Sequence, residues 1–141
     1  MHSTLNSFYS LKEISVITIR RHDIRRNIQK MKALKILQLG KFYPIMGGVE
    51  KVMYDLMSGL SERGVPCDML CALSQGSSRT FSINAHSRLI GCRTWMKVAA
   101  TMISPGMIFS LRKRCRDYDI IHVHHPDPMA CLALFLSGYR G

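Results

Sequence analysis

Three histidines close to one another could take part in chemistry. His122, His124 and His125 stand directly before the segment Pro126-Asp127-Pro128. A neutral imidazole can hydrogen-bond a sugar hydroxyl or a phosphate, and it can exchange a proton near neutral pH. On a strand, His122 and His124 share one face, and their spacing would also suit zinc if a further ligand were supplied. The alternative is that hydrogen bonds satisfy these histidines at the end of a strand and that they have no chemical role.

A second candidate site is the glycine pair Gly47-Gly48, which stands between a predicted strand and a predicted helix. Paired glycines let a ligand approach the backbone closely, and the free N–H groups of a first helical turn attract anions. Neither the dinucleotide-binding fingerprint nor the P-loop pattern is present. A phosphate-binding loop and a plain turn into a helix both remain open at this point.

The residues from 36 to 73 predict a strand, a helix and a second strand. The apolar run 36–39 ends at Gly40, as expected for a strand that is buried on both faces. Gly64 and Pro66 are typical of a helix end, and the run 67–73 predicts the second strand. A right-handed crossover makes the two strands parallel. The predicted helix has one apolar stripe: Val49, Val52, Met53, Leu56, Met57 and Leu60.

The rest of the chain continues this alternation. Ser104-Pro105 is a favourable helix opening, with serine as the cap and proline in the first turn. The pattern predicts an α/β fold with an open, Rossmann-like parallel sheet and helices on both faces. Ligands bind at the carboxyl ends of the strands in such sheets, so both candidate sites should lie at one edge. The predicted elements are a loop over 74–82, a strand over 88–92, a helix near 96–102, a helix from 105 to about 116, a strand over 119–124 and a helix over 126–136.

Composition narrows the class of protein. A chain of 141 residues that is 47% hydrophobic has the length and core of one domain. The net charge of +11 favours anionic partners such as phosphorylated substrates, nucleic acid or an acidic membrane surface. No RNA-binding aromatic motif is present, so we expect no nucleic acid as a partner. We also expect no stable protein partner. The odd number of cysteines, five, predicts reduced thiols and a cytoplasmic protein, with peripheral contact at the inner face of the membrane as an option.

The first 32 residues differ in character from the rest. Residues 1–32 hold seven Lys and Arg against two acidic residues. At Met31 the character of the sequence changes abruptly, and residues 31–40 resemble the start of a protein. Residues 14–19 alternate as a short strand would. We expect residues 1–32 to be a basic extension outside the fold and residues 33–141 to be the domain. The alternative is a basic arm that binds a membrane or nucleic acid.

Two segments together resemble the amino-terminal half of a family 4 glycosyltransferase with the GT-B architecture. They are residues 35–44 with Gly47-Gly48-Val49-Glu50, and residues 119–126 with their His-x-His pattern. The resemblance covers about residues 33–141. It implies two Rossmann-like domains that face each other across a cleft, with the acceptor site mostly on the amino-terminal domain. It also implies transfer from a nucleotide-sugar donor to a glycan or lipid-linked acceptor, with retention of configuration, no obligatory metal and no other cofactor.

The resemblance implies roles for four residues. Gly47 and Gly48 match the glycine loop that approaches the donor phosphate and the acceptor, and His122 is placed with them as a binding residue. His124 matches the residue that contacts the transferred sugar by hydrogen bonding, whereas no role is carried over to His125. The second domain of the family, with its paired glutamates, is absent here. We therefore expect a fragment of a polysaccharide-synthesising transferase that is inactive alone; the alternatives are a non-catalytic module that binds an anionic ligand or membrane surface, and a different nucleotide-binding Rossmann-like protein.

Overall fold

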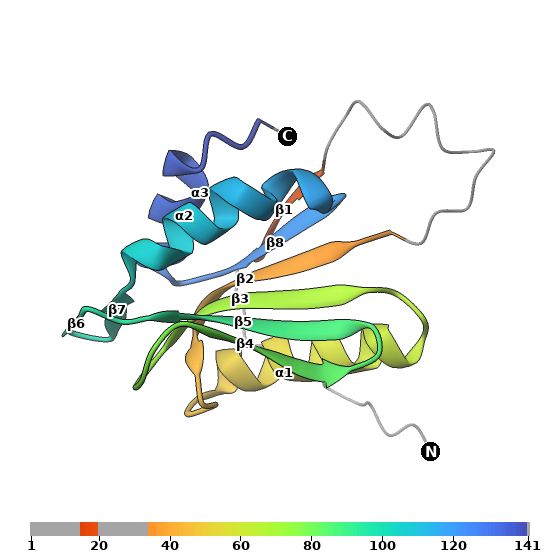
Figure 1. The fold of residues 1–141 in the computed structure, drawn as a ribbon, viewed down its shortest axis with the longest axis horizontal. Coiled ribbons are helices and arrows are strands. Elements are labelled where there is room, and N and C mark those ends of the chain that lie inside the picture. The colour runs from red at the N-terminus through yellow and green to blue at the C-terminus, as the bar shows by residue number, and fades with distance from the viewer. Residues whose placement is uncertain (1–14, 20–33, 141) are drawn as a thin grey trace, which may run out of the picture.

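A mostly parallel sheet forms the centre of residues 15–19 and 34–140, which the computed structural model describes. The strand order is β1-β8-β2-β3-β5-β4 (Figure 1). The four inner strands run parallel to one another, and β1 and β4 pair antiparallel at the two edges. The strands of this sheet are β1 (Ser15–Ile19), β2 (Ile36–Tyr43), β3 (Cys67–Leu73), β4 (Arg79–Asn84), β5 (Ser87–Arg93) and β8 (Ile120–His124).

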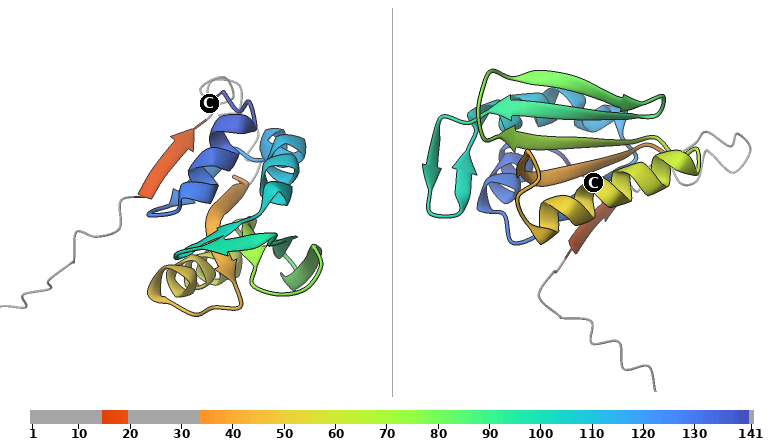
Figure 2. Two further views of the ribbon diagram at one scale, coloured as in Figure 1. Left: turned by 90° about the vertical axis from the view of Figure 1, so that its left-hand side faces the viewer. Right: turned by 90° about the horizontal axis from the view of Figure 1, so that it is seen from below.

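Helices cover both faces of this sheet (Figures 1 and 2). Helix α1 (Gly48–Glu62) packs on one face, and α2 (Pro105–Arg114) and α3 (Pro128–Leu136) lie side by side on the other. Each face has its own buried cluster, one centred on Met53 and Met57 of α1 and one beneath α2 and α3. The predicted α/β class is confirmed, an open and mostly parallel sheet with helices on both faces. The antiparallel pairing of the two edge strands was not predicted.

The predicted strand–helix–strand unit is present, and its helix ends just before the expected glycine, Gly64. All seven residues of β3 are buried, as its apolar sequence predicts for a central parallel strand. Leu37 and Leu39 of β2 are fully buried, and each such side chain contributes about 1.5–3 kcal/mol. Gly64 has φ of +76°, the left-handed conformation that glycine adopts readily after a helix.

The apolar stripe of α1 is only partly buried. Met53 and Met57 are fully buried, whereas Val52 is 45% exposed and Leu56 is 36% exposed. The acidic Glu50 is instead buried at the start of the helix. The helix turns a narrow methionine face to the sheet, so its outer apolar residues stay open to solvent.

Two regions differ from the prediction. Residues 79–82, the end of the loop expected over 74–82, belong instead to edge strand β4 (Arg79–Asn84), whose exposed positions alternate with half-buried Phe81 and Ile83. Residues 96–103, expected as a helix near 96–102, form a hairpin of β6 (Met96–Val98) and β7 (Thr101–Ile103). The hairpin is explained by the β-branched residues at 98, 101 and 103 and by the left-handed Ala99 in its turn.

Helix α2 begins as predicted but is capped differently. Pro105 occupies its first turn, yet the Ser104 hydroxyl donates to the backbone oxygen of Arg93 at 2.8 Å and caps no helical N–H. The helix ends at Arg114, and a 3-10 turn (Cys115–Asp117) replaces its expected last turn.

Strand β1 lies within the segment that we expected to be an extension. Its residues pair with β8 in an antiparallel register, with Ile17 opposite His122. The strand expected at residues 14–19 is thus present as Ser15–Ile19. Residues 1–14 and 20–33 lie outside the described residues, and the proposal that residues 1–32 are a separate extension stays a prediction.

Candidate functional site

The two predicted motifs lie after β2 and at the end of β8, at the carboxyl edge of the sheet, where Asp127 joins the end of β2 to the loop after β8. One carboxylate oxygen of Asp127 accepts hydrogen bonds from the backbone N–H groups of Met129 and Ala130, at 3.0 and 3.1 Å, and so caps α3. The other accepts from the backbone N–H of Lys41, near the carboxyl end of β2. A single buried side chain therefore fixes the carboxyl end of β2 relative to the loop after β8.

The backbone beside Asp127 is unusual and explains Gly40. Gly40 has φ of +132°, and a Cβ built on it would meet the Asp127 carboxylate at 3.1 Å. Lys41 has φ of +55°, which is uncommon for a residue with a side chain. Its ammonium group donates to the backbone oxygen of Pro126 at 2.6 Å. The end of β2 and the loop after β8 are thus held by a second bond, from side chain to backbone.

His124 is buried and bonded to a neighbouring strand. Only 3% of the residue is exposed, and its Nε2 contacts the amide oxygen of Gln38 on β2. Gln38 is itself fully buried, and its amide NH₂ donates to the Cys67 sulfur at 3.6 Å. This arrangement assigns the Nε2–H tautomer to His124, with Nε2 donating to Gln38 and Nδ1 left as an acceptor.

The histidines that share this face are neutral near pH 7. Burial, with the charges of His122 and His125, lowers the pKa of His124 to about 4. Burial also lowers the pKa of His122. The rings of His122 and His124 lie 4.2 Å apart, and the His122 Nε2 is buried without a hydrogen-bond partner among the described residues. The pair therefore offers uncharged hydrogen-bonding groups at the end of β8.

The glycine pair lies in the open at the start of α1. Gly47 and Gly48 are exposed, and Gly47 occupies the N-cap position without a side-chain cap. A Cβ added at Gly48 would meet nothing within 4 Å, and its φ lies outside the left-handed region. Neither packing nor backbone conformation requires glycine at position 48. A Cβ at Gly47 would approach the Glu50 carboxylate at 2.6 Å, so only that flexible side chain opposes it.

The structure brings the predicted residues to one edge of the sheet, but they differ in their exposure to solvent. The glycine pair is exposed and His124 is buried, with His122 and His125 between these extremes. Asp127 and Gln38 position the motifs and were not predicted to do so. Among the described residues, no group of three or more His, Cys, Asp or Glu side chains could hold a metal ion. No helix within residues 34–140 is long and apolar enough to cross a bilayer.

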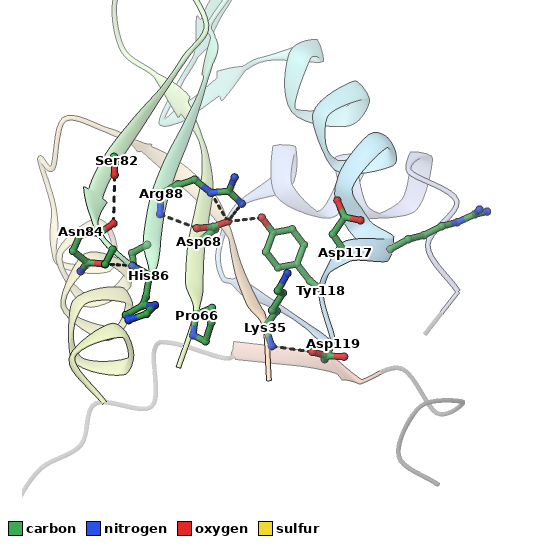
Figure 3. Close-up of a pocket in the computed structure, with 13 residues that line it drawn as sticks. Lys35, Pro66, Asp68, Ser82, Asn84, His86, Arg88, Asp117, Tyr118 and Asp119 are labelled. Carbon is green, nitrogen blue, oxygen red and sulfur yellow. Dashed lines mark hydrogen bonds and ion pairs between the residues drawn. The ribbon is translucent and has the colours of Figure 1, made fainter. Parts of the chain in front are cut away.

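A cavity of about 670 Å³ lies at the opposite edge, where the parallel strands begin (Figure 3). Asp68 lines this cavity. It accepts a hydrogen bond from the Tyr118 hydroxyl at 2.6 Å and forms an ion pair with Arg88 at 2.7 Å. The backbone N–H of Arg88 also donates to Asp68 at 2.7 Å. Burial and the bond to Asp68 raise the pKa of Tyr118, so it stays a donor. This network, which was not predicted from the sequence, ties the residue after the 3-10 turn to β3 and β5.

We expect Asp68→Ala to destabilise the domain by about 2–4 kcal/mol, because the buried Tyr118 hydroxyl and the Arg88 N–H lose their acceptor. The ion pair with Arg88 adds little, since the Arg88 side chain is 61% exposed. Urea unfolding measures the change. Tyr118→Phe removes one bond only and should cost about 1 kcal/mol. Equal losses for the two variants would contradict the network.

The family of the chain follows from comparisons with known proteins. The chain belongs to glycosyltransferase family 4, whose model matches residues 46–140 and so includes the glycine pair and the histidines. O-antigen chain mannosyltransferase C of Escherichia coli is 29% identical over 97 residues, which are 67% of this chain and 26% of that protein. The chain thus spans about a quarter of the length of this relative. No solved structure matches it.

Proposed function

We propose that the chain is the acceptor-side part of a retaining glycosyltransferase that moves a sugar from a nucleotide-sugar donor to a glycan or lipid-linked acceptor. Family membership supports glycosyl transfer, and the name of the relative supports mannose as the sugar and a cell-envelope polysaccharide as the product. We place this reaction in the cytoplasm, at the inner face of the membrane, without a required metal. A second domain outside this chain would bind the donor nucleotide, so the chain alone should be inactive.

The observation that best supports a role for the glycine loop is that position 48 is glycine without a structural need for it. The first-turn N–H groups of α1 have no partner within the helix and can bind a donor phosphate or an acceptor hydroxyl. An exposed backbone without a side chain lets that ligand come close. His124, held by Gln38, would then present a neutral ring to the sugar.

The role of His124 requires that its ring be reached. Because 3% of the residue is exposed, we propose that the loops at this edge shift when donor and acceptor bind. His124 would then accept or donate a hydrogen bond to a sugar hydroxyl and not attack the sugar itself. His122, with a buried nitrogen that has no partner among the described residues, would bind beside it.

Gly48→Val tests the loop in a longer protein that contains this chain and the second domain. We expect KM for the donor to rise about tenfold, the equivalent of about 1.4 kcal/mol, because the new side chain blocks the backbone N–H groups. The melting temperature should not fall, since the site of the new Cβ is empty. Steady-state kinetics and thermal denaturation measure both.

Gly59→Val is the matched control, because Gly59 lies in the same helix far from the edge, where only the exposed Arg63 side chain is close. It should leave KM unchanged. An unchanged KM for Gly48→Val as well would remove the glycine loop from the site. Donor binding without turnover in the wild-type longer protein would favour the non-catalytic binding module.

A further inference from the structure

One continuous stretch of the chain carries positive charge alone. Residues 69–116 contain eight Lys and Arg and no Asp or Glu. The stretch includes β4, β5, the β6–β7 hairpin and α2. A region of a single sign attracts anionic partners and not neutral ones. Which partner it suits depends on what the exposed side chains offer besides charge.

Helix α2 has an amphipathic arrangement in which the outer face is basic. Met107 and Leu111 are buried against the sheet. Phe109, Arg112 and Lys113 are exposed and lie three and four residues apart, so they share one face. Phe109 is 71% exposed. An exposed aromatic ring among cations is typical of a helix that lies on a membrane surface.

The β6–β7 hairpin carries the larger apolar surface. Trp95 is 75% exposed, Met96 is 59% exposed and Val98 is 54% exposed, with the cation Lys97 between them. The hairpin projects at one end of the sheet and leads directly into α2 (Figures 1 and 2). Tryptophan is favoured at the boundary between lipid headgroups and acyl chains because its ring is apolar and its N–H is polar.

We propose that the β6–β7 hairpin and the outer face of α2 form a docking surface for an anionic lipid bilayer. Lys and Arg near such a surface are attracted by its negative potential, and the exposed apolar side chains can enter the headgroup region. Nucleic acid explains the charge but gives no role to exposed Met96 and Val98. The surface therefore fits a membrane better than a duplex.

This docking surface lies next to the candidate site. A small cleft is lined by Ala100 and Thr101 of the hairpin together with Lys41 of β2 and with Pro126 and Asp127 of the loop after β8. Docking the hairpin on lipid would bring the carboxyl edge of the sheet to the bilayer, where a lipid-linked acceptor is held. The proposal extends the proposed function but does not depend on it, because vesicle binding requires no turnover.

Trp95 is the single tryptophan of the chain and so reports on the hairpin directly. We expect vesicles that contain phosphatidylglycerol to shift its emission to the blue and to shield it from acrylamide. Pure phosphatidylcholine vesicles should do neither. Raising the salt concentration should weaken binding, because headgroup attraction is screened. Binding to phosphatidylglycerol without any change at Trp95 would overturn the proposal.

Matched double variants separate the docking surface from overall charge. Arg112→Ala with Lys113→Ala should weaken vesicle partitioning on the order of tenfold or more. Lys51→Ala with Arg63→Ala removes the same charge from α1 and its C-cap, on the opposite face of the sheet, and should change vesicle partitioning little. Equal weakening by both pairs would overturn the proposal.

Two further measurements close the test. Met96→Ser with Val98→Ser keeps every charge and should weaken partitioning and reduce the blue shift. Circular dichroism confirms that each variant is folded. Tighter binding to duplex DNA than to phosphatidylglycerol vesicles at equal anion concentration, with no change at Trp95, would assign the surface to nucleic acid and overturn the proposal.

Discussion

Replacing His124 with alanine in the longer transferase should lower kcat by about 100- to 1,000-fold, the effect of losing one hydrogen bond to a developing charge. The bond to the sugar would form as the transition state forms, so KM should change much less. Single-turnover kinetics and kcat per folded molecule measure the effect. The size of this effect is what distinguishes a hydrogen bond to the reacting sugar from a role in packing.

The alternative for His124 is a buried histidine that only stabilises the strand end. It predicts a lower melting temperature and normal turnover per folded molecule, which thermal denaturation beside kcat will reveal. Near-normal turnover after His124→Ala would end the catalytic assignment. Gln38→Leu offers an independent check, because it frees the ring without removing it. If Gln38 positions His124, Gln38→Leu should lower kcat less than His124→Ala does. It should also shift the pH dependence of kcat.

The pH dependence of stability has a definite sign. The folded pKa of His124, about 4, lies below its unfolded value near 6.5. Between these values the unfolded chain binds a proton that the folded domain excludes, so stability falls as the pH drops from about 6.5 towards 4. His122, whose pKa is lowered too, acts in the same direction. His124→Ala should therefore make urea unfolding less sensitive to acid over this window.

Asp127→Ala should lower the free energy of unfolding by about 2–4 kcal/mol. The change removes the cap of α3, which contributes about 1 kcal/mol, and leaves the Lys41 N–H without its acceptor, which costs about 1–3 kcal/mol. Urea unfolding of the chain measures the total. Loss of loop order should also appear as faster amide exchange at Lys41.

Two substitutions at the same position divide this effect. Asp127→Ser keeps a capping oxygen but offers nothing to Lys41, and Asp127→Asn caps α3 but turns an N–H donor towards the Lys41 N–H. The free energy of unfolding of both variants should lie between those of the wild type and Asp127→Ala. In Asp127→Asn the loss should come mainly from the Lys41 N–H, which has no acceptor. A cost below about 0.5 kcal/mol for Asp127→Ala would show that the end of β2 and the loop after β8 are held together without it.

Regular apolar patterns explain why much of the fold was predictable. The run 67–73, apolar except for Asp68, and the helical period from 49 to 60 are strong signals, and Gly64 marks the helix end between them. Edge strand β4 was missed because only one of its faces is half-buried, and Arg79, Thr80 and Ser82 resemble loop residues. The hairpin at 96–103 was missed because Met96 and Val98 of β6 face solvent and only Met102 of β7 is buried, so the sequence shows no core-facing period.

The candidate site was predictable in its motifs but not in its supports. Glycine and histidine positions can be found from spacing, whereas the hydrogen bonds that join them depend on strand register. A signal for Asp127 existed, since an aspartate directly before Pro128 is typical of a capped helix start. Gln38 was a polar residue within a buried strand, which requires a buried partner. Which partner it takes follows only from the pairing of β2 with β8.

The position of β8 in the sheet has a consequence for synthesis of the chain. β2 lies between β3 and β8, yet more than half of the chain separates the end of β2 from the start of β8. At a translation rate of ~5–20 residues per second, the ribosome takes about 4–15 s to cover that interval. During this time β2 can pair with β3, but its other side stays unpaired. The nascent chain must therefore be protected from aggregation at that strand until the histidine segment emerges.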